Sequence, residues 1–129
     1  MATALIILAA GKGTRMKSDL PKVLHKVAGV PMLHHAMRGG AALSPERTIV
    51  VAGHGADQVE KAAKDYDPDA LIALQEEQHG TGHAVSMAKP ALDDFSGDAI
   101  VLYGDTPFIS PETLERMAET RKSHDVVVL

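Results

Sequence analysis

Two glycines and several basic residues are gathered in one short segment near the start of the chain. The segment reads Leu8-Ala9-Ala10-Gly11-Lys12-Gly13-Thr14-Arg15-Met16, with Lys17 and Lys22 following. Backbone amides beside glycine can approach a phosphate closely because no side chain intervenes. The chain as a whole carries 17 acidic and 13 basic residues, a net charge of −4. A cationic segment in an acidic chain predicts an anionic ligand at residues 12–22.

The segment departs from both common glycine-rich nucleotide motifs. The dinucleotide fingerprint needs a third glycine where Met16 stands, and the Walker pattern needs Gly-Lys-Ser/Thr where Met16 and Lys17 stand. A glycine turn whose basic side chains are simply solvated is the alternative. The density of positive charge favours the phosphate site.

Polar residues that could bind a nucleotide occur after two later apolar runs. Gln75 offers a donor and an acceptor, which match the edge of a uracil ring, and Gly80 lets backbone approach a base. Asp105 follows Gly104 and has two interpretations: it caps the turn before Pro107, or it holds Mg²⁺ together with substrate phosphates. A triphosphate-binding loop nearby favours the interpretation of Asp105 as a magnesium ligand.

The histidines of the second motif are not expected to do chemistry. His79 and His83 form an i, i+4 pair without the Glu spacing of a metalloprotease. We interpret Gln78, His79 and His83 as polar surface or cap residues.

Five apolar runs, separated by amphipathic segments, must position these residues. The runs, each expected to be a strand, are residues 4–9, 48–52, 70–74, 99–103 and 126–129. The expected helices are residues 32–38 between Pro31 and Gly39-Gly40, a segment around 59–66, a segment from 84 that Pro90 ends early, and one capped by Ser110-Pro111. This alternation predicts an α/β fold, a Rossmann-like three-layer sandwich with a mainly parallel sheet. Ligands of such sheets bind at the carboxyl ends of the strands, here residues 10–22, 75–81 and 104–107.

Composition excludes several classes of protein. Hydrophobic residues make up 45% of the chain and cysteine is absent, which excludes a disordered chain, a disulfide-stapled one and a zinc site built on thiolates. The negative charge argues against nucleic acid as a partner. The apolar run near the start, residues 4–10, is far shorter than the roughly 20 residues of a membrane span. We expect a cytoplasmic protein with no membrane partner.

Three motifs resemble those of the sugar-nucleotide pyrophosphorylases, a nucleotidyltransferase family. They are residues 8–16 with the following Ser18-Asp19-Leu20-Pro21-Lys22-Val23-Leu24, residues 75–84, and Tyr103-Gly104-Asp105-Thr106-Pro107. Within that family the chain looks most like bacterial uridylyltransferases acting on N-acetylglucosamine 1-phosphate. The resemblance implies the pyrophosphorylase fold, UTP and a sugar 1-phosphate as substrates, Mg²⁺ as cofactor, and UDP-N-acetylglucosamine and pyrophosphate as products, a step in cell-wall precursor synthesis.

The resemblance also implies roles for individual residues. Arg15 and Lys22 would be catalytic and would stabilise charge on pyrophosphate and around the α-phosphorus. Asp105 would be a magnesium ligand. The residues implied to bind the nucleotide are Leu8, Ala9, Ala10, Gly11, Lys22, Gln75, Gly80 and Thr81, and those near the sugar nucleotide are Tyr103, Gly104 and Asp105.

The family's uridylyltransferase domain is longer than this chain. We therefore expect residues 1–129 to form its nucleotide-binding N-terminal part, without the sugar-binding remainder and without the trimer-forming acetyltransferase domain. A strand edge at residues 126–129 that pairs with another copy, giving a homo-oligomer, is a further expectation. The alternatives are a nucleotidyltransferase for another sugar 1-phosphate or base, and a non-catalytic nucleotide-binding module.

Overall fold

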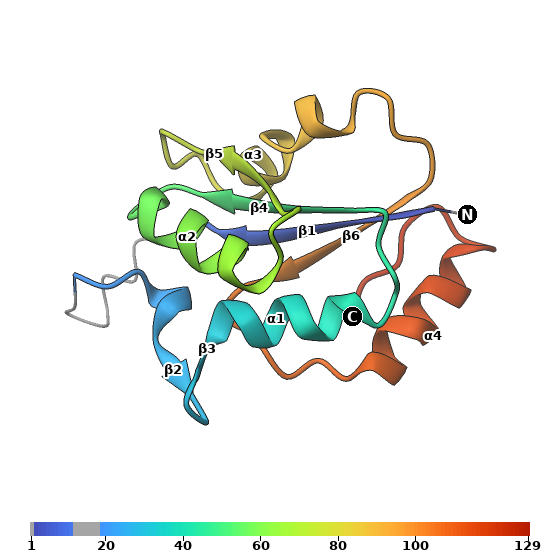
Figure 1. Cartoon of the computed structure of the whole chain (residues 1–129). Helices are drawn as coiled ribbons and strands as arrows, with labels where there is room; N and C mark the ends of the chain where they lie inside the picture. Colours follow the sequence, from blue (N-terminus) through green and yellow to red (C-terminus); the bar gives the residue numbers. More distant parts are fainter. Residues whose placement is uncertain (1, 12–18) are drawn as a thin grey trace.

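The computed structural model describes residues 2–11 and 19–129, and its centre is a four-stranded parallel sheet. The strands are β1 (Thr3–Ala9), β4 (Arg47–Ala52), β5 (Leu71–Leu74) and β6 (Asp98–Tyr103), in the spatial order β5-β4-β1-β6. Ile6 of β1 pairs with Ile49 of β4 on one side and with Val101 of β6 on the other. All four carboxyl ends therefore lie at one edge of the sheet (Figure 1).

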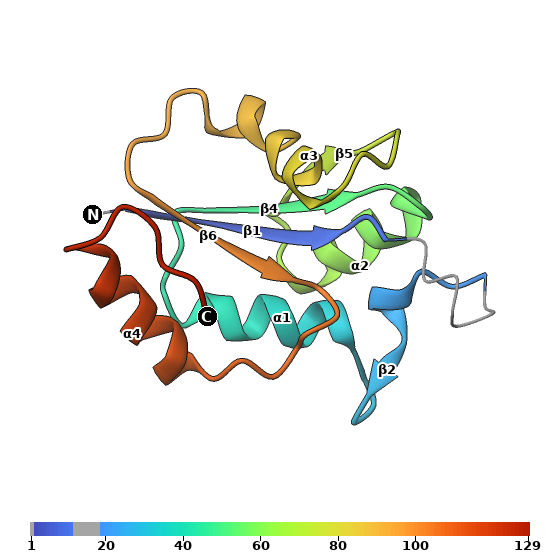
Figure 2. The ribbon, with the colours of Figure 1, turned by 180° about the vertical axis from the view of Figure 1, so that it is seen from behind.

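Alternate side chains of β1 enter two separate cores. Leu5, Ile7 and Ala9 face one core, whereas Ile6 and Leu8 face the other. A strand buried on both faces is continuously apolar, as the sequence of β1 is. Figures 1 and 2 show the resulting three layers.

The helices divide unequally between the two faces. The first core is covered by α1 (Met32–Ala41), α2 (Ala56–Tyr66) and α4 (Pro111–Arg121), which contribute Leu33, Val59 and Leu114. The second lies under the short helix α3 (Thr81–Ser86) and the 3₁₀ turn η3 (Lys89–Leu92). The predicted α/β three-layer architecture is confirmed.

The predicted end of one helix and one predicted strand are wrong. The helix expected to stop at Gly39-Gly40 continues through both glycines to Ala41. The reason is packing, because a Cβ on Gly40 would collide with the side chain of Leu5. The apolar segment 126–129 is not a strand. It forms no ladder in the described structure, and Val126, Val128 and Leu129 are at least 75% exposed.

A small hairpin and a 3₁₀ turn, neither predicted, follow residue 19. The turn η2 (Lys22–Leu24) leads into β2 (Lys26–Val27) and β3 (Val30–Pro31), which pair antiparallel. Ala28 and Gly29 connect them with φ of 53° and 78°, as a two-residue hairpin turn requires. This unit places η2 beside the carboxyl ends of the strands.

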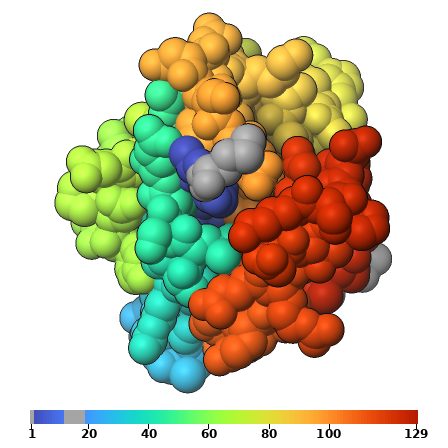
Figure 3. All heavy atoms as spheres, turned by 90° about the vertical axis from the view of Figure 1, so that its right-hand side faces the viewer, coloured from blue at the N-terminus to red at the C-terminus, as the bar shows by residue number. Residues whose placement is uncertain are grey.

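Other elements surround the opposite end of the sheet, where the strands begin. Figure 3 looks onto this face, where α4 and the C-terminal segment (red) and α1 (teal) lie around the start of β1. None of the helices in the two described ranges is long and apolar enough to cross a membrane.

Candidate functional site

A cavity of about 230 Å³ opens at the carboxyl ends of the strands. Residues that follow β1, β5 and β6 line it together with η2, although these segments are far apart in the sequence. The lining residues are Leu8, Ala9, Ala10, Gly11, Lys22, Val23, Gln75, Gln78, Gly80, Thr81, Ala84, Tyr103 and Asp105.

Lys22 and Asp105 form an ion pair at the cavity wall. The distance from Lys22 Nζ to Asp105 Oδ2 is 3.1 Å, and the two side chains are 42% and 34% exposed. Lys22 begins η2, which the buried Val23 anchors against the end of β6. Close approach is possible because residue 104 is glycine: a Cβ there would lie 2.8 Å from Val23 Cγ1. An ammonium and a carboxylate are thus held side by side where water and ligands reach both.

Gln75 is the one buried polar side chain in the described part of the chain, at 2% exposure. Its backbone N–H donates to Ala52 O, which extends the β4–β5 pairing by one residue. Its Nε2 donates to Gly80 O over 3.3 Å and to His83 Nδ1 over 2.9 Å. The amide nitrogen of this buried side chain therefore has its hydrogen-bond acceptors within the protein, as buried polar atoms require.

Gln78 links the second motif to the first. Its Nε2 donates to Ala10 O over 3.1 Å, across 68 residues of sequence. Gly53 makes this approach possible, since a Cβ there would lie 2.8 Å from Gln78 Nε2. The backbone after β1 and the loop after β5 are therefore parts of one wall.

Most of the sequence-predicted site residues meet at this cavity. All of the predicted nucleotide-binding residues line it, as do Tyr103 and Asp105. Gly104 lies beside it and donates its backbone N–H to Leu8 O over 2.9 Å. Arg15, like Lys12 and Lys17, lies outside the described residues.

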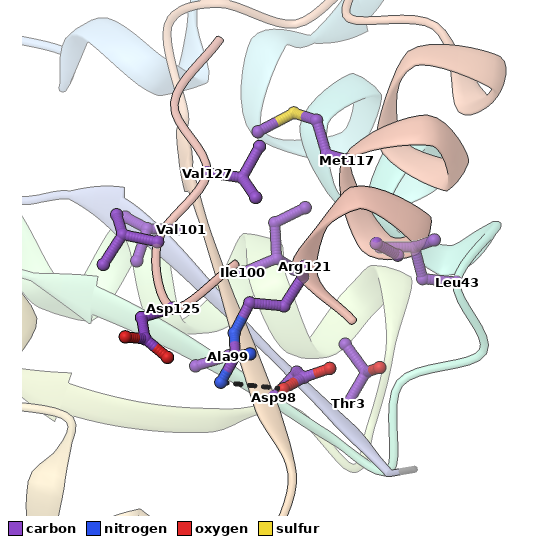
Figure 4. Close-up of a pocket in the computed structure, with 12 residues that line it drawn as sticks. Thr3, Leu43, Asp98, Ala99, Ile100, Val101, Met117, Arg121, Asp125 and Val127 are labelled. Atoms are coloured by element: carbon purple, nitrogen blue, oxygen red, sulfur yellow. Dashed lines mark ion pairs between the residues drawn. The ribbon is translucent and has the colours of Figure 1, made fainter. Parts of the chain in front are cut away.

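A second cavity, of about 310 Å³, lies between β6, α4 and the C-terminal segment (Figure 4). Its walls are mainly apolar, from residues such as Ile100, Met117 and Val127. Its charged residues include Arg121 and Asp98, which already pair with each other at 3.5 Å. It adjoins Thr3 and Asp98, where strands begin, and so lies away from the edge at which the three motifs meet.

The model of the MobA-like NTP transferase domain family matches residues 5–129. The chain belongs to this family. Among curated relatives, the bifunctional protein GlmU of Ruegeria pomeroyi is 66% identical to this chain over all 129 residues. The chain spans only 29% of that protein's length.

Solved structures with similar folds include a nucleotidyltransferase. A nucleotidyl transferase from Methanothermobacter thermautotroptrophicus superposes with a TM-score of 0.76 at 26% identity, over 92% of this chain and 57% of that one. HddC from Yersinia pseudotuberculosis, solved in complex with GMP-PN, has a TM-score of 0.74 at 25% identity, over 92% and 53%.

Two further residues take part in the structure of this candidate site in a way that the sequence did not reveal. Gln78 is exposed, as expected of a polar surface residue, but it also lines the cavity. His83 is half-buried and bonds to Gln75. Their position within the second motif was the available signal. An i, i+8 contact between Gln75 and His83 becomes visible only once the loop between them is folded.

Proposed function

We propose that this chain carries the nucleotide-binding part of a uridylyltransferase, which transfers UMP from UTP to N-acetylglucosamine 1-phosphate. The observation that carries the proposal is the convergence of three separate motifs on one cavity that contains the Lys22–Asp105 pair. The resemblance of those motifs to uridylyltransferases and the 66% identity to GlmU support it. We further propose that the reaction is cytoplasmic, where nucleotides and sugar phosphates are made.

The donor set at the cavity fits a metal ion that arrives with its nucleotide. No group of three or more His, Asp or Glu side chains within residues 2–11 and 19–129 could hold a metal alone. Mg²⁺ in nucleotide sites is usually held by one or two carboxylates, substrate phosphates and water. Asp105 fits the role of that carboxylate. Bound there, Mg²⁺ would neutralise charge on the phosphates.

The protein groups would mainly position the substrates and neutralise the charge on their phosphates. A sugar 1-phosphate is largely dianionic near neutrality, since the second pKa of a phosphate monoester is about 6. Its oxygen can form the new bond to the α-phosphorus of UTP while the bond to the pyrophosphate oxygen breaks, so no protein base is required. Lys22 would leave Asp105 for a phosphate and stabilise the departing charge, a role we also propose for Arg15.

The nucleoside would lie between the first and second motifs. Residues 8–11 and the Gly80-Thr81 pair supply backbone that approaches closely, and Gln75 supplies an amide for the base edge. Tyr103 and Gly104, at the end of β6, would meet the sugar nucleotide.

Calorimetry with UTP and Mg²⁺ tests the proposal on this chain. We expect saturable binding by the wild type, at least about tenfold weaker binding by Asp105→Asn, and no change in Asp93→Asn, whose exposed carboxylate is off the cavity. Wild-type protein that binds no UTP at millimolar concentration would overturn the proposal.

A pyrophosphate-release assay with N-acetylglucosamine 1-phosphate separates an enzyme from a binding module. The second candidate is a non-catalytic nucleotide-binding module, because the chain matches only 29% of the length of its relative GlmU. A panel of nucleoside triphosphates and sugar 1-phosphates addresses the remaining candidate, a transferase of different specificity, because HddC was solved with a guanine nucleotide analogue.

A further inference from the structure

The amide of Gln75 is held from one side by two acceptors. Gly80 O lies 3.3 Å and His83 Nδ1 lies 2.9 Å from the same atom, Nε2. A carbonyl oxygen can only accept, so the nitrogen of the amide must face Gly80. If the amide rotated by half a turn, two oxygens would confront each other in a buried place.

This orientation of the amide fixes the tautomer of His83. Because Gln75 Nε2 donates, Nδ1 of His83 must carry a lone pair, and the proton of the neutral ring is on its Nε2. The ring packs edge-on against His79, with centroids 5.0 Å apart and planes at 84°. Its backbone carbonyl accepts from Ser86 Oγ over 2.6 Å, which holds His83 within α3.

The amide oxygen is then the atom left for a ligand. Within the described residues, both hydrogen bonds of the Gln75 amide use Nε2, and Gln75 lines the cavity. An acceptor in that place favours a base that presents a ring N–H. Uracil presents N3–H, whereas cytosine, of the same size, presents an unprotonated ring nitrogen that would face the oxygen with another lone pair.

We propose that His83 is a positioning residue for base selection: together with Gly80 O it fixes Gln75 with its oxygen toward the base, and so favours uracil over cytosine. The proposal rests on the proposed function, because it takes the cavity as the nucleotide site. Without the His83 acceptor, the amide nitrogen keeps only the longer bond to Gly80, and the flipped amide that serves cytosine becomes accessible.

The test compares dissociation constants of UTP and CTP, measured with Mg²⁺ by calorimetry. His83→Phe keeps a ring of similar shape but removes the acceptor, and we expect the UTP preference to fall by about tenfold. His83→Asn places an amide oxygen near the position of Nδ1 and should restore most of the preference. The matched control His79→Phe keeps the ring contact, has no bond to Gln75 and should leave the preference unchanged. If His83→Phe weakens UTP and CTP equally, His83 is merely structural and the proposal is wrong.

A measurement without nucleotide separates this proposal from the proposed function. ¹⁵N NMR of the histidine rings reports which nitrogen carries the proton. We expect His83 in the free protein to be protonated at Nε2 and to accept at Nδ1, and a proton on Nδ1 would overturn the proposal even if UTP binds. The expected tautomer combined with no UTP binding would overturn the proposed function and, with it, the assignment of base selection. Thermal unfolding of each variant identifies any that fail to fold.

Discussion

Gly80 occupies a backbone conformation that other residues rarely adopt. Its φ of 96° and ψ of 178° lie in a region that is essentially limited to glycine, and its carbonyl is the one that fixes Gln75. A Cβ there would meet nothing within 4 Å, so the cost of a substitution is conformational rather than steric.

We therefore expect Gly80→Ala to lower the free energy of unfolding by about 1–3 kcal/mol and to weaken UTP binding. Gly82 is the matched control, since it also has open space around it but lies in α3 without a positive φ. Gly82→Ala should be neutral or stabilise by about 0.5–1 kcal/mol. Urea unfolding measures both, and equal effects of the two substitutions would contradict the conformational explanation.

At single residues, the sequence indicated part of the set that the fold brings together at the cavity. Gln75 and Asp105 were identified from their types and from their place after apolar runs, and both line the cavity. The pairing of Lys22 with Asp105 could not be predicted from the sequence, because 83 residues separate them. The turn η2 brings the two side chains to 3.1 Å. The part played by His83 depends equally on a folded loop.

The junction between β4 and the loop after β5 depends on a glycine. A Cβ on Gly53 would lie 2.8 Å from Gln78 Nε2 and 2.9 Å from the Gln75 carbonyl oxygen. The loop would have to move away from Ala10, to which Gln78 is bonded.

We expect Gly53→Ala to weaken UTP binding several-fold and to destabilise the fold by about 1–3 kcal/mol, in the range of overpacked positions. Gly82→Ala is the steric control, because a Cβ there meets nothing within 4 Å and Gly82 does not line the cavity. Titration with UTP and urea unfolding test this. An unchanged affinity in Gly53→Ala would show that the loop does not need this close approach.

At the level of elements, apolar periodicity predicted all four strands of the sheet within one residue at each end. Capping chemistry predicted the start of α4 correctly, where Ser110 Oγ accepts from Thr113 N. The errors arose where tertiary contacts decide. The helix α1 continues through Gly39 and Gly40, and at Gly40 it packs closely on Leu5 of β1. The segment 126–129, although apolar, has no partner strand among the described residues.

For the whole molecule, ligand binding and stability are linked. A ligand that binds only the folded state stabilises it by about 2.7 kcal/mol at 100 times its dissociation constant. In a domain of this size that corresponds to a rise in Tm on the order of 10 °C.

We expect UTP with Mg²⁺ to raise the Tm of the wild type by this amount and that of Lys22→Met by clearly less. Lys26→Met is the control, because Lys26 is exposed in β2 and does not line the cavity. Scanning calorimetry at several UTP concentrations checks this. A Tm that is independent of UTP in all three proteins would contradict the prediction.

The spatial order β5-β4-β1-β6 also constrains how the chain can acquire its structure. The first strand to be synthesised lies in the interior of the sheet, and one of its neighbours, β6, begins 95 positions later, at Asp98. Until that neighbour is available, Leu5 and Ile6 belong to an open edge strand, and unpaired edges of this kind favour association with other chains. Pairings so distant in sequence close slowly. A nascent chain emerging from the ribosome must therefore keep β1 protected until β6 has been made.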